Sequence, residues 1–203
     1  ANVITGGSGS DTLDGRGGLD VLAGGAGDDT LTYRGGEVSV AGGAATDTLV
    51  LAAAGGTTTV DLSVASGADQ TVGDTVAVAD FENVDASQLG TGLTLTGSSA
   101  ANVIVGSGGD DTIHGGGGGD AITAGGGDDR VDYRGGESSI AGGTGTNTLV
   151  MQAATAVDLG VGADQTTGDG VTVTGFVDVD AGALDSAHGV TLTGSTAANR
   201  ITG

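Results

Sequence analysis

Large aliphatic residues recur at every ninth position in two stretches of the chain. In residues 6–32 they are Leu13, Leu22 and Leu31, and each stands between small or polar neighbours. One inward side chain between two outward ones is typical of a short β-strand. Glycine-rich segments separate these triplets and predict tight turns. The same frame returns in residues 106–132, so the pattern predicts two blocks of short strands and turns.

Each nine-residue row in these blocks fits G-G-x-G-x-D-x-U-x, where U is the large aliphatic residue. Glycine accepts positive φ, so the first half of a row can turn tightly and expose its carbonyls. Aspartate at the sixth position supplies the hard anionic oxygen that Ca²⁺ prefers. If two rows make one coil, the aspartates of alternate rows lie above one another and can share an ion. A nonapeptide period of this kind predicts a parallel β-solenoid with Ca²⁺ in its turns.

Weaker rows extend both blocks in the same frame. Asp47 keeps the sixth-position carboxylate, whereas Val38 has lost it. The second block carries Ser138 and Asn147 at the matching positions. Three further rows have asparagine instead of aspartate at the sixth position, namely Asn2, Asn102 and Asn199.

The whole chain reads as one unit of about one hundred residues written twice. The expected units are copy 1 in residues 1–96 (nonapeptide roll 2–50, wider coils 51–96), copy 2 in residues 97–193 (roll 97–150, wider coils 151–193), and the start of a third copy in residues 194–203. Between the nonapeptide blocks, segments such as 58–62 and 81–85 alternate like strands. We interpret them as wider coils of the same solenoid, with loops at residues 52–56 and 67–73. The predicted fold class is therefore all-β, a right-handed parallel β-roll or β-solenoid with Ca²⁺ in the turns.

Composition strengthens the case for a metal. The chain has a net charge of −21, 45 glycines, and neither cysteine nor proline. Such a chain buries little apolar surface, so cations must neutralise its carboxylates before it can fold. The acidity argues against nucleic-acid binding, and the lack of cysteine excludes a disulfide framework or thiolate metal site. No apolar run is long enough for a transmembrane helix.

We expect two stacks of Ca²⁺ sites in each copy. The first stack uses Asp11, Asp29 and Asp47, with Asp111 and Asp129 in the second copy. The second stack pairs Asp20 with Asn2 and Asp120 with Asn102, while Asn199 would share an ion with a following unit. Carbonyl ligands are expected from turn glycines at the second and fourth row positions: Gly7, Gly9, Gly18, Gly25, Gly27, Gly109, Gly116, Gly118, Gly125 and Gly127.

The rows in residues 6–32 and 106–132 resemble the RTX, or haemolysin-type, calcium-binding nonapeptide repeat family. The resemblance implies an extracellular or cell-surface location, type I secretion, Ca²⁺-induced folding and a place in a tandem repeat of a bacterial surface or extracellular protein. The intervening segment, with Phe81-Glu82-Asn83-Val84-Asp85, resembles sequences that link such blocks in large bacterial surface proteins.

The sequence contains no catalytic motif, which favours a structural module over an enzyme. His114 and His188 are lone imidazoles that we expect on the surface. We therefore predict a Ca²⁺-dependent module of an adhesin, S-layer or extracellular fibre protein. Such a module could stack head-to-tail, because both ends carry the same row. The alternative is a secretion and folding domain of an extracellular enzyme whose catalytic domain lies outside this chain. A carbohydrate- or ice-binding face ranks lower, because the outward threonines are irregular.

Overall fold

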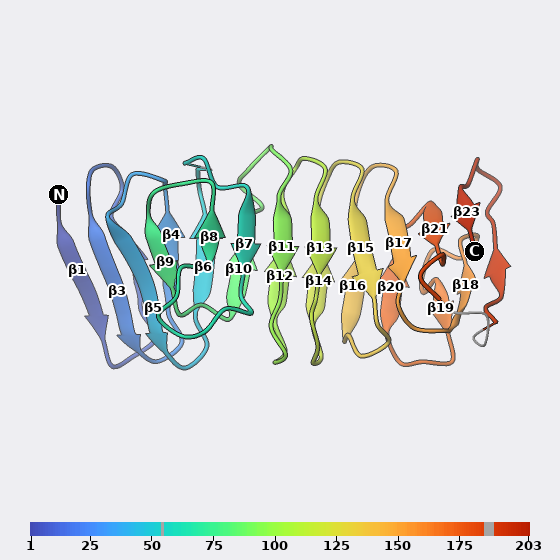
Figure 1. Cartoon of the computed structure of the whole chain (residues 1–203), viewed down its shortest axis with the longest axis horizontal. Helices are drawn as coiled ribbons and strands as arrows, with labels where there is room; N and C mark the ends of the chain where they lie inside the picture. The colour runs from blue at the N-terminus through green and yellow to red at the C-terminus, as the bar shows by residue number, and fades with distance from the viewer. Residues whose placement is uncertain (54, 185–188) are drawn as a thin grey trace.

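A computed structural model describes residues 1–53, 55–184 and 189–203, and the expected surface position of His188 lies outside these residues. The described chain forms strands and turns without any helix. The short strands lie side by side along the long axis of the molecule, and the two termini lie at opposite ends (Figure 1). The prediction of an all-β solenoid is confirmed. No helix in the described part of the chain is long and apolar enough to cross a membrane.

Two long sheets and two short ones make up the solenoid. The first long sheet contains, in order, β2 (Thr12–Asp14), β4 (Thr30–Tyr33), β6 (Thr48–Leu51), β10 (Asn83–Asp85), β12 (Val103–Val105), β14 (Ala121–Thr123), β16 (Ser139–Ala141) and β20 (Thr172–Thr174). The second long sheet contains β8 (Thr71–Val72), β7 (Thr59–Asp61), β11 (Thr94–Thr96), β13 (Thr112–His114), β15 (Arg130–Tyr133), β17 (Thr148–Met151), β21 (Asp178–Asp180) and β23 (Ile201–Thr202). The short sheets are β1 (Val3–Gly7), β3 (Val21–Ala26), β5 (Ser39–Ala44) and β9 (Ala77–Ala79), and β19 (Thr166–Thr167), β18 (Ala156–Asp158) and β22 (Leu192–Thr193).

The nonapeptide frame sets the register of the parallel strands. Leu13 pairs with Leu31, and Leu31 pairs with Leu49. These leucines are almost fully buried, as are Leu22 and Ile122 in the other rows. One large aliphatic side chain per row therefore builds a continuous core, because each inward residue packs on the one a coil away.

The intervening segments differ in one respect from the expected parallel coils. β7 pairs with β8 in antiparallel register, and β18 pairs with β19 in the same way. β8 lies inside the loop expected at residues 67–73. Asp69 Oδ1 stabilises this return, since it accepts hydrogen bonds from the backbone N–H groups of Thr71 and Val78 at 3.2 and 3.1 Å. Each intervening segment thus inserts a two-stranded hairpin into the solenoid.

The hairpin has a consequence for the two blocks. β6 is followed in the first long sheet by β10 and β12, so the face that carries Asp29 and Asp47 continues into the face that carries Asn102 and Asp120. The expected continuation through Asp111 and Asp129 is wrong, because their strands β13 and β15 belong to the second long sheet. Equivalent strands of the two copies therefore lie in different sheets, as β2 in the first long sheet and β13 in the second show. The unit boundaries expected at residues 97 and 194 stay a prediction.

Candidate metal-binding turns

The glycines at the second and fourth positions of a row shape its turn. At the second and fourth positions the backbone adopts positive φ, as in Gly25 at 113° and Gly27 at 110°. This region of the backbone strongly favours glycine. The expected turn glycines share this conformation except Gly9 and Gly109; those with positive φ are Gly7, Gly18, Gly25, Gly27, Gly116, Gly118, Gly125 and Gly127.

The sixth-position aspartates form hydrogen-bonded ladders. The backbone N–H of Asp11 donates to Asp29 Oδ1 at 2.8 Å, and the N–H of Asp29 donates to Asp47 Oδ1 at 2.8 Å. The N–H of Asp111 donates to Asp129 Oδ1 at 2.9 Å. The asparagine rows continue the ladders. The backbone N–H of Asn2 donates to Asp20 Oδ1 at 2.6 Å, and that of Asn102 donates to Asp120 Oδ1 at 2.9 Å. The structure therefore brings together the residue pairs expected within each stack.

In four of the ladder aspartates the second carboxylate oxygen accepts no hydrogen bond. Oδ2 of Asp20, Asp29, Asp47 and Asp129 is buried and accepts no hydrogen bond. These four side chains are at most 1% exposed. An unpaired, buried anionic oxygen costs several kcal/mol, and proteins retain one only when a cation or a proton neutralises it.

At Asp29, the glycine at the first row position shows which group of the next coil lies near Oδ2. A Cβ on Gly24 would lie 2.2 Å from Asp29 Oδ2 and 2.5 Å from Gly42 O of the next coil. The carboxylate and the carbonyl are therefore no more than about 5 Å apart, a span that one Ca²⁺ with ligands at roughly 2.3–2.6 Å can bridge. Two acceptors this close together, one of them a carboxylate oxygen that accepts no hydrogen bond, suit a hard cation. This carbonyl belongs to the first row position, whereas the carbonyl ligands were expected at the second and fourth positions.

Burial changes the acidity of these groups. Loss of solvation raises the pKa of Asp47 to about 6 and the pKa of Asp129 to about 6, and nearby carboxylates add to the effect. Burial likewise raises the pKa of Asp111 and of Asp120. Without a cation, the folded chain therefore holds protons at these positions more tightly than an unfolded chain does.

The comparison with known families agrees with this geometry. Residues 1–31 and 96–131 match the model of the RTX calcium-binding nonapeptide repeat, in four copies. These two blocks are similar to the RTX repeat family, and together they make up about a third of the chain. A search of curated proteins finds no match to the chain. RTX repeats bind Ca²⁺ and form this type of parallel β-solenoid, so the buried carboxylates of the RTX blocks fit their metal.

The asparagines of the RTX frame behave differently from the aspartates. Asn147 Nδ2 donates a hydrogen bond to Gly175 O at 3.0 Å, and Asn199 Nδ2 donates to Val177 O at 2.8 Å. Asn102 Nδ2 donates to Glu82 O at 2.5 Å. The amide thus supplies a donor to a carbonyl of the neighbouring coil, which a carboxylate cannot do. Whether Asn2, Asn102 and Asn199 also share an ion stays a prediction.

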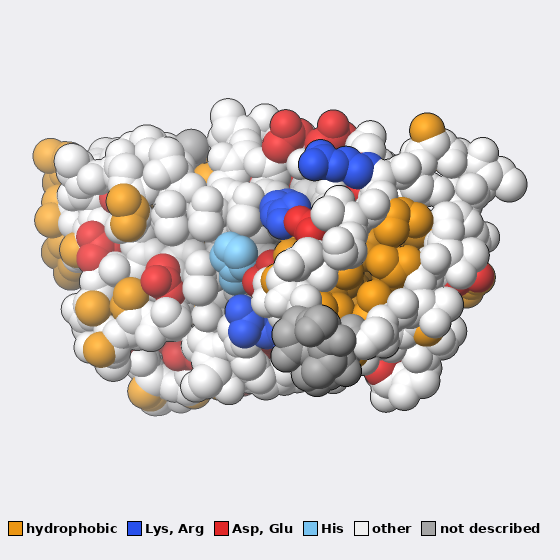
Figure 2. All heavy atoms as spheres, turned by 45° about the vertical axis from the view of Figure 1, so that its right-hand side comes forward, with side chains coloured by type: hydrophobic (Ala, Val, Ile, Leu, Met, Phe, Trp, Pro, Cys, Tyr) orange, Lys and Arg blue, Asp and Glu red, His pale blue; other side chains and the backbone are white. Residues whose placement is uncertain are grey.

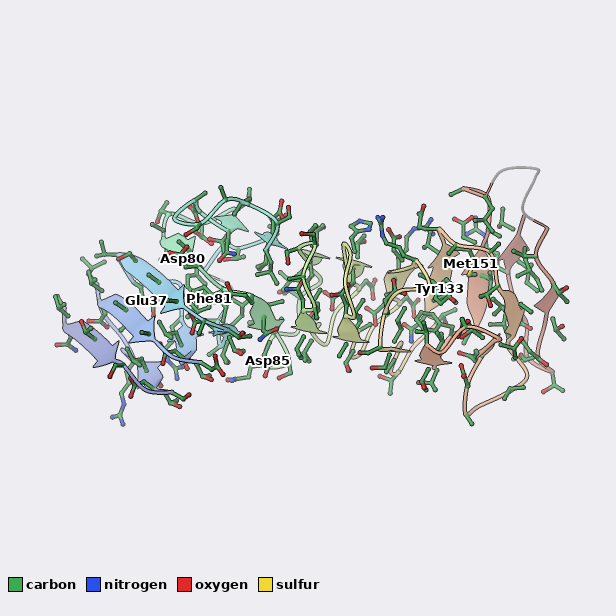
Figure 3. The ribbon with its side chains drawn as sticks, turned by 90° about the horizontal axis from the view of Figure 1, so that it is seen from below. Glu37, Asp80, Phe81, Asp85, Tyr133 and Met151 are labelled. Atoms are coloured by element: carbon green, nitrogen blue, oxygen red, sulfur yellow. The ribbon has the colours of Figure 1, made fainter. Side chains whose placement is uncertain are left out.

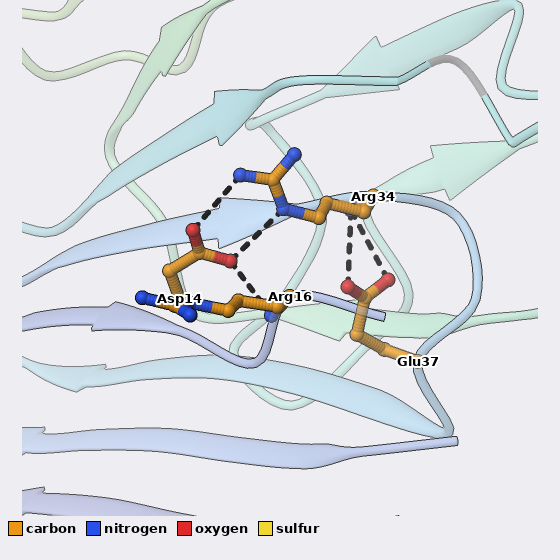
Figure 4. Close-up of polar contacts among 4 residues, drawn as sticks. All are labelled: Asp14, Arg16, Arg34 and Glu37. Carbon is orange, nitrogen blue, oxygen red and sulfur yellow. Dashed lines mark hydrogen bonds and ion pairs between the residues drawn. The ribbon is translucent and has the colours of Figure 1, made fainter. Parts of the chain in front are cut away.

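The rows with Val38 and Ser138 close their turns without a sixth-position carboxylate. Glu37 accepts the N–H of Arg34 at 3.1 Å and the N–H of Gly36 at 3.0 Å, and it is 4% exposed. Glu137 has the same role in the second block. Figure 4 shows this turn beside the ion pair of Arg34 with Asp14. These turns point N–H groups at an internal anion, and they have no sixth-position carboxylate to offer a metal. The recurrence of Arg-Gly-Gly-Glu in both copies is the sequence signal for this arrangement.

The remaining charged side chains form no larger site in the described residues. No group of three or more His, Asp or Glu side chains gathers there in a way that could hold a metal. His114 pairs with Asp132 at 2.8 Å on the outside of the solenoid, in agreement with its expected surface position. Figure 2 shows acidic and basic side chains interspersed on one face, with no continuous basic patch. The RTX turns are therefore the candidate metal sites.

Proposed function

We propose that this chain is a Ca²⁺-dependent structural module of a secreted bacterial surface, adhesin, S-layer or extracellular fibre protein. The observation that carries the proposal is the set of buried, unpartnered carboxylate oxygens at the turns of Asp20, Asp29 and Asp129. Each lies where stacked coils meet, so an ion bound there would join one coil to the next. Binding free energy then becomes folding free energy.

The continuity of the sheets supports a structural role. The first long sheet runs from β2 to β20 across both RTX blocks without a break. At the far end β23 pairs with β21, just as β12 pairs with β10 at the junction of the two blocks. Further units could therefore add to the solenoid, either along one polypeptide or by head-to-tail association. Such an association would not close on itself and would produce a fibre.

The same features support an extracellular setting. RTX proteins are typically secreted. This chain contains no cysteine, so its fold does not depend on the redox state of its surroundings. A chain of net charge −21 repels itself until cations bind, and it remains unfolded where Ca²⁺ is scarce. We propose that Ca²⁺ outside the cell triggers folding after type I secretion.

Circular dichroism of the whole chain in chelator and in millimolar Ca²⁺ tests the proposal. We expect a largely unfolded spectrum in chelator and a β-rich spectrum in Ca²⁺. Mg²⁺ at the same concentration serves as the control, because it dehydrates reluctantly and demands a tighter octahedral geometry. Identical spectra in chelator and in Ca²⁺ contradict the proposal. Sedimentation in Ca²⁺ then distinguishes a monomeric module from one that stacks end to end.

A further inference from the structure

Asp47 lies at the last RTX-like turn before the intervening segment. The nine-residue frame places no aspartate on the coil that follows it. Its Oδ2 is buried and unpartnered, and the side chain is 0% exposed. The residue one coil below, Asp29, already uses Asp47 Oδ1 as its hydrogen-bond acceptor. The orphaned oxygen therefore faces the next coil, which is formed by residues outside both matched RTX blocks.

Glu82 occupies the next rung of the ladder. β10 pairs with β6 in register, with Val84 opposite Leu49, so Glu82 stands two residues before an inward side chain as Asp47 does. The backbone N–H of Asp47 donates to Glu82 Oε2 at 2.8 Å, the contact that Asp29 makes with Asp47 Oδ1. The separation in sequence is 35 residues instead of 18, which is why the nine-residue frame misses it.

The backbone of Asp80 supplies a second oxygen. Asp80 O and Asp47 Oδ2 both approach the place where a Cβ on Gly42 would lie, so the two oxygens are no more than about 5 Å apart. Asp80 has a φ of 61°, and its side chain is held away by Ser66 Oγ at 2.6 Å and by the N–H of Gly67 at 2.7 Å. The side chain therefore anchors an uncommon backbone conformation that presents the carbonyl. Asp80 and Phe81 lie together on the segment that leads to β10 in Figure 3.

A cavity opens beside this position. It has a volume of about 290 Å³, and Gly43, Asp80 and Glu82 are among the residues that line it. It leaves room for water molecules beside Asp80 and Glu82, whereas Asp47 itself does not line it.

The second copy is an internal control. There Asn147 replaces Asp47, Val177 replaces Glu82 and Gly175 replaces Asp80. Asn147 Nδ2 donates to Gly175 O at 3.0 Å, so an amide proton lies where the first copy has only oxygen acceptors. The second copy satisfies the contact by a hydrogen bond, whereas the first copy needs a cation or a proton between these oxygens.

We infer that Asp47 Oδ2, Asp80 O and Glu82 form a Ca²⁺ site outside the RTX repeats, present in the first copy and absent from the equivalent place in the second. This inference rests on the proposed Ca²⁺ binding by the stacked turns. An ion bound at this site would clamp the intervening segment onto the last nonapeptide coil of the first block. The ion column on this face therefore extends past the repeats into the segment that links them.

The test is the number of Ca²⁺ ions bound by the whole chain, measured by equilibrium dialysis with elemental analysis. Glu82→Gln should bind one ion fewer than the wild-type chain. Asp85→Asn removes the same charge three residues further along the chain, at the end of β10, and it should leave the number unchanged. The double variant Asn147→Asp with Val177→Glu transfers the ligands to the second copy and should bind at least one ion more.

The outcomes separate this site from the proposed function. Equal numbers of ions for wild type and Glu82→Gln overturn the site while the RTX sites stand. A wild-type chain that binds no Ca²⁺ overturns the proposed function itself. If circular dichroism in Ca²⁺ shows that Glu82→Gln fails to fold, the double variant decides, and the absence of any gained ion then contradicts the inference.

Discussion

Replacing Asp129 by asparagine should have opposite effects with and without Ca²⁺. Asp129 is 1% exposed, its Oδ1 accepts the N–H of Asp111, and its Oδ2 has no donor. An asparagine can keep the first hydrogen bond and add a donor at the second oxygen's position. Asn147 already does this one coil away. The substitution therefore removes an uncompensated charge but also removes a metal ligand.

The magnitude without Ca²⁺ follows from the acidity of the group. Burial raises the pKa of Asp129 from 3.8 to about 6. Keeping the carboxylate ionised in the folded chain at neutral pH thus costs on the order of 2–3 kcal/mol. Asp129→Asn should raise the free energy of unfolding in chelator by up to about that amount. With Ca²⁺ at a hundred times its Kd, losing one ion should lower it by about 2.7 kcal/mol.

The assay is folding followed by circular dichroism under two conditions. In chelator, an excluded osmolyte drives folding, and the variant should need less of it than the wild type. In millimolar Ca²⁺, denaturant unfolding should show the variant to be less stable. Asp128→Asn is the matched control, because it removes the same charge from an exposed neighbour and should change either value by less than about 0.5 kcal/mol. A variant that is destabilised in both conditions refutes the reasoning.

Two further predictions use the same turns. In chelator the folded fraction should rise as the pH falls from 7 toward 4, because the pKa of Asp47 and of Asp129 is about 6 in the folded chain and 3.8 in the unfolded chain. Circular dichroism against pH checks this. Excess Ca²⁺ should reverse the trend, since protons then displace the ion. Gly24→Ala should weaken Ca²⁺ binding at least tenfold in a calorimetric titration, because its Cβ would lie 2.2 Å from Asp29 Oδ2, whereas Gly9→Ala meets nothing within 4 Å and should bind normally.

The parts of the fold with a fixed period could be predicted from the sequence. Leu13, Leu31 and Leu49 are buried and paired as the nine-residue frame requires, because one inward side chain per short strand leaves a single register. The relation between the two blocks could not be predicted. It depends on how many strands the segment between them contributes to each sheet. The antiparallel β7–β8 hairpin within this segment has no repeating sequence pattern from which that number could be predicted.

The candidate site divides in the same way. The stacked pairs such as Asp11 with Asp29 follow from spacing alone, since adjacent coils of equal length bring equal positions together. Glu82 and Glu37 were missed for different reasons. Glu82 reaches the column only because a longer coil lies between it and Asp47, and Glu37 folds back on the backbone of its own turn. The short motif Phe-Glu-Asn-Val-Asp, with an acid two residues before the inward Val84, is the signal that could have identified Glu82.

A crystal structure grown in Ca²⁺, with the ions located by anomalous scattering, tests the central claim most directly. The account predicts ions at the stacked turns, each within roughly 2.3–2.6 Å of Oδ2 of Asp20, Asp29, Asp47 or Asp129. Turns that contain no anomalous peak, with these oxygens hydrogen-bonded to protein or water donors instead, would contradict it.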